Sequence, residues 1–365
     1  MGNTRSIARL GVLAVGLGIG AAWAHTPVAS ADSSSDWLST VDSLVSGLPA
    51  APTPIDVDIS FDGYTIYDGG GTAVANTGAA GNGLYDLAIA YGANSSATAE
   101  GGIGDYALAS GTNALASAGS LTATGDNFDT AIDIGNNADP SSYPGDPFGA
   151  YAGGASLIGG TDTGTNSNDT AIDIGNDSPI SSSDGGTSGA FAGDSGLIGD
   201  EGPPTSGSGD FASTTGNLEG LNDGSAAVGG NYDYASSTGS ETGDSEGAFA
   251  AFGNNNTAIA DANYTTNGDG AAAQFGNGNY AYVYGPDNSN ALAGGDGPTD
   301  LGNNDVAYIS DPFSSITGPA DTATAGTSFS NDLAEVLFTH GTASADTANL
   351  LYDFVSLFGN FTGSL

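Results

Sequence analysis

The chain has 365 residues, of which 42 are Asp or Glu and only two are Lys or Arg, so its formal net charge is −40. It has no cysteine, so no disulfide can stabilise it outside the cell. Direct binding of nucleic acid is excluded because phosphate contacts depend on Lys and Arg, and an anionic membrane surface is disfavoured for the same reason.

The first 31 residues are typical of a secretory signal peptide. Arg5 and Arg9 precede an apolar run at 10–24, and Ala29-Ser30-Ala31 is an A-x-A cleavage site. We therefore expect a secreted or surface-exposed protein that is cleaved after residue 31, with no transmembrane segment in the mature chain.

Cleavage would remove both basic residues and leave every acidic one. The carboxylates would then have to be solvated, hydrogen-bonded to backbone N–H groups, protonated or neutralised by cations. A cationic partner, a host surface and a homo-oligomer all remain open.

Residues 32–54 are predicted to form a short amphipathic helix at 36–48 and then a Pro-rich linker. Residues 55–80 are predicted to form the opening strands, because apolar and polar residues alternate up to Phe61. Asp62-Gly63 is a hairpin turn signal, and 64–67 would return as the partner strand.

The central part of the chain contains an internal repeat. The octamer DTAIDIGN occurs at 129–136 and again at 169–176, and a second match at the same offset relates 148–160 to 188–200. Such a unit cannot bury its own apolar face and must stack on a copy of itself. Each octamer is therefore predicted to supply the strand and turn of one coil.

The alternation within the octamer predicts which side chains face the core. In a strand, Ile132 and Ile134 share one face, and Ala131 and Asp133 share the other. Because isoleucine is the more apolar residue, the isoleucines are predicted to point inward and the central aspartates to point to solvent. The predicted core stack is Ile132, Ile134, Ile172 and Ile174, and the predicted solvent-facing residues are Asp133 and Asp173.

Residues 81–310 have the same texture throughout, with short apolar strings bounded by Gly, Asn, Asp or Ser. The predicted fold is mainly β, a parallel β-solenoid or β-roll of short degenerate repeats with short helices at both ends. Residues 176–225 are the most irregular and are predicted to form long loops or to be partly disordered. Few large apolar residues and a high charge are also typical of disordered chains, so a largely disordered acidic surface coat is the second alternative.

Residues 330–365 are predicted to form a helical cap. One helix would begin at Ser330 or Asn331 and end before Gly341. A second helix would begin near residue 344 and end before Gly359. Neither carries the basic residues of a membrane-surface helix, so a cap on the last coil is the preferred interpretation.

Three strings carry a resemblance to known families: GTNALASAG at 111–119, GNNNTAIADAN at 253–263 and GNGNYAYVYG at 276–285. They resemble the repeats of trimeric autotransporter adhesin heads, which are left-handed parallel β-rolls. With its Ala-rich signal peptide and flanking helices, the chain also resembles the secreted Gly/Asn/Ala-rich repeat proteins of mycobacteria. The resemblance implies a structural or adhesin-like role at the cell surface.

No catalytic residue is predicted. Asp162-Thr163-Gly164 and Asp194-Ser195-Gly196 copy the core of aspartic protease motifs, but glycine-containing stretches precede them in place of apolar strands. His340 ends a predicted helix, where a capping role is the simpler interpretation. The chain is therefore predicted not to be an enzyme.

No metal or cofactor residue is assigned either, although calcium remains an alternative. Gly294–Leu301 resembles a calcium-binding nonapeptide with one residue too many before the aspartate. Asp56, Asp58 and Asp62 depart from a calcium loop because Ser60 stands at the third ligand position. The leading prediction is a non-enzymatic structural or adhesin-like repeat protein, and the first alternative is an acidic exoprotein whose Asp/Asn-rich turns bind calcium.

Overall fold

The computed structural model describes the chain in segments between residues 56 and 358. These segments are 56–79, 84–119, 127–137, 148–153, 167–177, 188–193, 208–218, 224–228, 231–238, 248–250, 253–260, 271–273, 276–283, 290–294, 302–309, 322–324, 332–338, 342–344 and 353–358. The predicted signal peptide, the helix at 36–48 and the Pro-rich linker lie outside the described residues.

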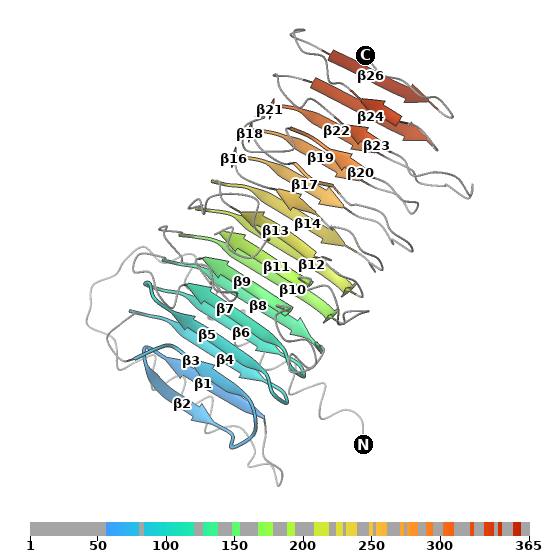
Figure 1. Cartoon of the computed structure of the whole chain (residues 1–365). Helices are drawn as coiled ribbons and strands as arrows, with labels where there is room; N and C mark the ends of the chain where they lie inside the picture. The colour runs from blue at the N-terminus through green and yellow to red at the C-terminus, as the bar shows by residue number, and fades with distance from the viewer. Residues whose placement is uncertain are drawn as a thin grey trace, which may run out of the picture.

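The described strands form a solenoid-like stack (Figure 1). The larger sheet has 13 strands, in the spatial order β2 (Tyr64–Asp68), β1 (Val57–Phe61), β4 (Leu87–Tyr91), β6 (Tyr106–Ser110), β8 (Thr130–Gly135), β10 (Thr170–Asp177), β12 (Phe211–Leu218), β14 (Tyr234–Thr238), β17 (Thr257–Ala260), β19 (Tyr280–Val283), β22 (Val306–Ile309), β24 (Asp332–Phe338) and β26 (Asp353–Phe358). The second sheet has seven strands, in the order β15 (Phe249–Ala250), β13 (Gly224–Val228), β11 (Ser188–Gly193), β9 (Phe148–Gly153), β7 (Leu115–Gly119), β5 (Ser96–Glu100) and β3 (Val74–Asn76).

Two three-stranded sheets extend the stack. One contains β16 (Gly253–Asn254), β18 (Gly276–Asn277) and β21 (Gly302–Asn303), and the other contains β20 (Asn290–Leu292), β23 (Thr322–Thr324) and β25 (Thr342–Ser344).

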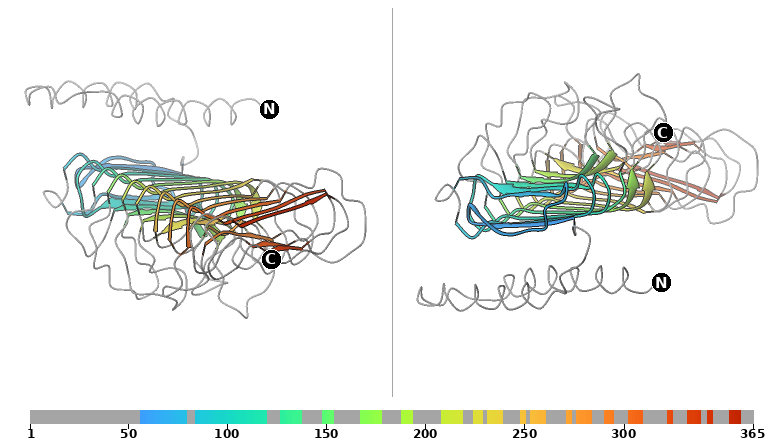
Figure 2. Two further views of the ribbon diagram at one scale, coloured as in Figure 1. Left: turned by 90° about the horizontal axis from the view of Figure 1, so that it is seen from above. Right: turned by 90° about the horizontal axis from the view of Figure 1, so that it is seen from below.

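Each coil from β4 to β15 contributes one strand to each of the two large sheets. From β4 to β15 the chain alternates between the 13-stranded and the seven-stranded sheet, and neighbouring strands of successive coils run parallel. In both views of Figure 2 the colour runs from blue to red along the stack, so the coils follow one another in chain order. The predicted mainly β architecture with parallel sheets is confirmed.

The 40-residue repeat places identical residues on top of one another. Thr130 of β8 pairs with Thr170 of β10, and the match continues without a shift to Gly135 and Gly175. The second repeated block pairs β9 with β11 in the same way. The prediction that each octamer supplies the strand of one coil is therefore confirmed. The segment 176–225 contains β11 and β12, and its remaining parts are only partly within the described residues.

An antiparallel hairpin ends the stack on the N-terminal side. β1 and β2 pair across Asp62 and Gly63, whose φ angles of 52° and 80° are those of a tight turn. β1 also pairs antiparallel with β4, the first strand of the parallel series. The hairpin predicted from the alternation and the Asp-Gly signal is present.

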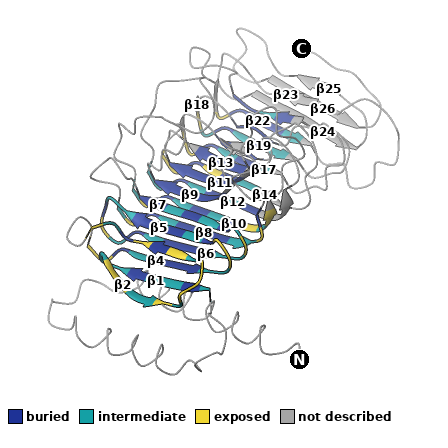
Figure 3. Cartoon of the chain, turned by 60° about the horizontal axis from the view of Figure 1, so that its bottom comes forward, coloured by how far each residue is buried: buried dark blue, intermediate teal, exposed yellow. Residues whose placement is uncertain are grey.

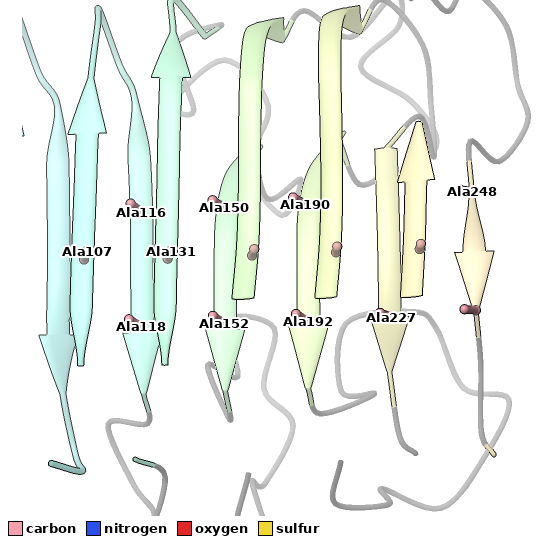
Figure 4. Packing of buried hydrophobic residues seen from close by; sticks show 14 of the residues in the cluster. Ala107, Ala116, Ala118, Ala131, Ala150, Ala152, Ala190, Ala192, Ala227 and Ala248 are labelled. Carbon is pink, nitrogen blue, oxygen red and sulfur yellow. The ribbon is translucent and has the colours of Figure 1, made fainter. Parts of the chain in front are cut away.

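Alanine fills the interior. The buried apolar cluster consists of alanine alone, and most of its members are 0% exposed. In the 13-stranded sheet, one alanine per strand forms a continuous inward row: Ala88, Ala107, Ala131, Ala171, Ala212, Ala235, Ala258, Ala281 and Ala307. Figure 4 shows two matching rows on the seven-stranded sheet, with Ala116, Ala150 and Ala190 in one and Ala118, Ala152 and Ala192 in the other. Because each methyl group contributes little, cohesion depends on the number of stacked coils.

The predicted orientation of the octamer is wrong. Ala131 and Asp133 point into the coil and are 0% and 1% exposed, whereas Ile132 and Ile134 lie on the outer face and are partly exposed. Figure 3 shows this alternation of buried and intermediate residues along the strands. The physical reason is space: alanine rows from both sheets face each other, so the inward positions accept small side chains and no isoleucine.

The second octamer departs from the prediction in the same way. Ala171 and Asp173 are buried inside the coil, at 0% and 2% exposure. Ile172 and Ile174 lie on the outer face, where Ile174 is 41% exposed. Asp173, predicted to face solvent, is therefore an interior residue like its partner Asp133.

The C-terminal helices are also a wrong prediction where the chain is described. Asp332–Phe338 forms β24 in place of the first helix, and Asp353–Phe358 forms β26 within the second. β24 continues the parallel sheet, with Ala334 in register with Ala307 of the preceding coil. The sequence LAEVLF fits both helical and alternating spacing, and pairing with an existing sheet edge favours the strand.

Candidate functional site

The most unusual feature of the interior is a column of acidic and amide side chains. One such residue stands immediately before each strand of the 13-stranded sheet from β4 to β22, and each is at most 1% exposed. We call this column the aspartate ladder; its members are Asp86, Asp105, Asp129, Asp169, Asp210, Asp233, Asn256, Asn279 and Asp305.

Each ladder side chain from Asp86 to Asn279 accepts a hydrogen bond from the backbone of the next coil. Oδ1 of Asp129 accepts the N–H of Asp169 at 3.0 Å, and Oδ1 of Asp169 accepts that of Asp210 at 2.9 Å. The same bond recurs along the column, with nitrogen–oxygen distances from 2.7 to 3.2 Å. The ladder therefore ties successive coils together at the point where the chain turns into the sheet.

A left-handed residue before each ladder position makes this geometry possible. Most of these residues are Gly or Asn, but Tyr85, Phe128 and Tyr232 adopt φ angles of 73°, 62° and 60°, which bulky residues rarely do. The rings of Phe128 and Tyr232 lie over Gly104 and Gly209 of the preceding coil, where an added Cβ would be 2.8 and 2.7 Å from the ring. Glycine in one coil thus makes room for the aromatic ring of the next.

A second column of polar residues lies deeper in the strands. In register with Ala109 of β6, the next coils carry Asp133, Asp173 and Thr214, all buried. Oδ2 of Asp133 accepts the backbone N–H of Leu115 at 2.6 Å, across the coil. We call Asp133, Asp173 and Thr214 the inner polar column.

Side-chain hydrogen bonds complete the inner polar column. Nδ2 of Asn137 donates to Oδ2 of Asp133 at 2.8 Å, and the hydroxyl of Thr214 donates to Oδ1 of Asp173. Burial raises the pKa of Asp133 well above its usual range, and the neighbouring Asp173 carboxylate raises it further. Like charges in adjacent coils cannot both be ionised cheaply, so the pair favours a form in which Asp133 is protonated.

Glycines of the seven-stranded sheet make room for the ladder. An added Cβ would lie 2.5 Å from Oδ2 of Asp129 at Gly153, and 2.9 Å from Oδ2 of Asp169 at Gly193. Both glycines have positive φ angles, 79° and 104°. The repeated Gly of the FGAYAGG and SGAFAGD blocks is therefore explained by the aspartate that it faces in the same coil.

Burial also raises the pKa values of the ladder. The pKa of Asp86 rises to about 6, that of Asp210 to about 8 and that of Asp233 to about 9, in each case chiefly through loss of solvation. Acidic neighbours add to the rise, Asp169 for Asp210 and Asp210 for Asp233. With at most 2% of each side chain exposed, neither column is open to a substrate, so their chemistry is the holding of hydrogen bonds and protons.

The outer face of the 13-stranded sheet is the second candidate feature. Aromatic rings from neighbouring strands stack there, Phe211 on Tyr234 at 5.4 Å and Tyr282 on Tyr308 at 5.1 Å between ring centroids. Tyr234 is 37% exposed. Threonine and isoleucine occupy the equivalent outward positions of β8, β10 and β17, whereas the outward Ile89 and Leu108 of the first coils are buried. We call this face the outer strip.

The residues considered from sequence are mostly separated or not described. Asp162, Asp194, His340 and all of the predicted calcium nonapeptide except Gly294 lie outside the described residues. Asp56 and Asp58 each accept backbone N–H groups, of Ala73 and Ala75 respectively. No group of three or more His, Asp or Glu side chains within the described segments is arranged to hold a metal ion.

The ladder could have been found from the sequence. Every strand of the series is preceded by Asp or Asn and begins with one variable residue and Ala, as in DLAI, DYAL, DTAI, DFAS and NTAI. That three-residue signal recurs in all coils from β4 to β22, whereas the octamer occurs only twice. It was missed because hydropathy assigns aspartate to the surface.

Within the described residues no helix is long and apolar enough to span a bilayer. Comparisons with protein-family models, with curated proteins and with solved structures found no match to this chain.

Proposed function

We propose that this chain is a secreted or surface-exposed, non-enzymatic display module with an adhesin-like role. The observation that carries the proposal is the continuous 13-stranded sheet, whose outward positions align from coil to coil. A stack of this kind offers an extended, rigid face, which suits contact with a large partner. The signal-peptide pattern of the first 31 residues supports placement outside the cell.

The outer strip is the surface that such contact would use. It combines stacked aromatic rings with β-branched residues, and aromatic side chains supply much of the energy at protein contact surfaces. The chain has no lysine and no arginine beyond Arg9, so the partner surface would be neutral or cationic.

Bead adhesion tests the proposal. Beads coated with the full-length chain are applied to a fixed epithelial monolayer and washed, in parallel with beads coated with the Phe211→Ser/Tyr234→Ser variant. We expect the variant to reduce bead retention by roughly tenfold, because the partly exposed Phe211 and the exposed Tyr234 of the outer strip are lost. The control is Tyr64→Ser, which removes a 64% exposed ring from β2.

Two outcomes would count against this function. One is wild-type retention equal to that of uncoated beads. The other is unchanged retention for the outer-strip variant while its melting temperature matches the wild type. Export is tested separately by mass spectrometry of protein from the culture medium, where we expect Asp32 at the N-terminus.

A further inference from the structure

We propose that the aspartate ladder takes up protons when the chain folds. The stability of the solenoid then depends on pH: the stack is most stable in acid and becomes less stable as the pH rises. The inference concerns the interior of the coils and does not depend on the surface role proposed above.

The geometry of the second carboxyl oxygen supports it. Oδ2 of Asp86, Asp210 and Asp233 is buried and has no hydrogen-bond partner, although Oδ1 of each is bonded to the next coil. An ionised carboxylate can only accept hydrogen bonds, and a buried charge without a partner is costly. A protonated acid is neutral, which removes the cost of the buried charge.

Nothing that faces these oxygens supplies a positive charge. Asp210 lies between Asp169 and Asp233 along the ladder, and the strands across the interior, β11 and β13, have the sequences SGAFAG and GSAAV. The chain neighbours of Asp233, Tyr232 and Tyr234, are not cationic either. Neutralisation by an ion pair is therefore unavailable within the described coils.

The first rung has the same kind of surroundings. Asp86 faces Asp62 and Glu100 as well as the next rung, Asp105, and all three are acidic. Burial raises the pKa of Asp86 most, and the Asp62 and Glu100 carboxylates raise it further, whereas the backbone N–H groups of Asp105 and Gly104 that bond to Oδ1 lower it in part.

Two rungs of the ladder are already neutral. Asn256 and Asn279 stand where the other coils have aspartate, and each accepts the N–H of the next rung at 3.2 Å through Oδ1. Asparagine has the shape of a protonated aspartic acid, with one acceptor oxygen and one donor group. The backbone bond that defines the ladder thus requires an acceptor and no charge.

The sign of the pH dependence follows from the raised pKa values. An unfolded aspartate has a pKa of about 3.9, whereas in the folded chain the pKa is about 8 for Asp210 and about 9 for Asp233. Between these limits the folded state holds more protons than the unfolded state. The stability that the ladder contributes is complete below about pH 4 and is lost as the pH rises towards 8 or 9.

Thermal unfolding of the full-length chain, followed by circular dichroism at about pH 5 and about pH 8, tests the proposal. Surface carboxylates also titrate, so the control is Asp68→Asn, which removes one exposed charge from β2. The informative quantity is the change in melting temperature between the two pH values, compared between each ladder variant and this control. We expect Asp233→Asn to raise the melting temperature at the higher pH by on the order of 10 °C and to leave it unchanged at the lower pH. The reciprocal change, Asn256→Asp, is expected to lower the melting temperature at the higher pH only.

The opposite results overturn the proposal. If Asp233→Asn lowers the melting temperature at both pH values, or fails to fold at the lower one, the ladder requires a carboxylate. If Asn256→Asp changes the melting temperature equally at both pH values, an aspartate at that rung does not bind a proton in the folded chain. If EDTA lowers the melting temperature of the wild type and leaves Asp233→Asn unchanged, a metal ion and not a proton neutralises the ladder.

Discussion

The first coils and the middle coils of the solenoid fill one interior position with opposite chemistry. In β4 and β6 the position is Ala90 and Ala109, whereas in β8 and β10 it is Asp133 and Asp173. The register does not shift between them, and all four residues are at most 2% exposed. The comparison indicates that the interior selects for volume before polarity: a carboxyl group fits where its oxygens find donors, and a larger apolar chain does not.

Enlarging an inward alanine should have the largest effect. Ala171 lies between Ala131 and Ala212 in the inward row and is 0% exposed. Ala171→Leu adds three carbon atoms where both neighbours and the facing sheet are fixed, so we expect a loss of more than about 3 kcal/mol in the free energy of unfolding. Loss of the cooperative melt in circular dichroism is the expected readout, and an unchanged melt would contradict the close spacing of the two sheets.

Adding a methyl group opposite a ladder carboxylate should come next. In Gly153→Ala, the new Cβ would lie 2.5 Å from Oδ2 of Asp129, and the residue would keep a φ angle of 79°. Left-handed alanine alone costs roughly 1–2 kcal/mol, and the clash adds to it. We expect urea unfolding to show a total loss of about 2–4 kcal/mol.

Gly70→Ala is the matched control for that loss. Gly70 has a φ angle of 73° with no atom within 4 Å of an added Cβ, so this variant has the backbone penalty without the clash. Equal losses in the two variants would show that the aspartate does not need the space that Gly153 leaves.

The inner polar column predicts a smaller, pH-dependent effect. Asp133→Ala leaves the N–H groups of Leu115 and Asn137 without their acceptor, at a cost of about 1–3 kcal/mol. Asp133→Asn keeps an acceptor oxygen and should cost less. Burial and Asp173 raise the pKa of Asp133, so the wild type loses stability as the pH rises. The free energy of unfolding of Asp133→Asn, relative to that of the wild type, should therefore increase from acid to alkaline pH. Urea unfolding across that pH range measures this difference. A relative stability of Asp133→Asn that falls as the pH rises would contradict the prediction.

Strand position, parallel stacking and the pairing of the 40-residue repeats could be predicted from the sequence, because β-strings and Gly/Asn turns are local signals. Which side chains of each strand point into the interior could not be predicted. Hydropathy ranks isoleucine above alanine and aspartate, and it contains no information on the distance between the sheets. Ile134 was predicted inside and Asp133 outside, and packing reverses both. The C-terminal strand β24 was missed for a related reason: its pairing partner lies in a different part of the chain.

The smallest effect is expected on the outer face of the strand that carries Ala171. Ile174 is 41% exposed and points away from the interior, so Ile174→Thr keeps a β-branched residue in the strand and removes little buried area. A change of no more than about 0.5 kcal/mol in urea unfolding is expected, against the collapse expected for Ala171→Leu three residues earlier. The two variants lie on opposite faces of the same strand. The ratio of their losses in free energy of unfolding therefore tests which face of the strand points into the interior. A loss at Ile174 as large as that at Ala171 would restore the isoleucines to the core and remove the aspartates from the interior.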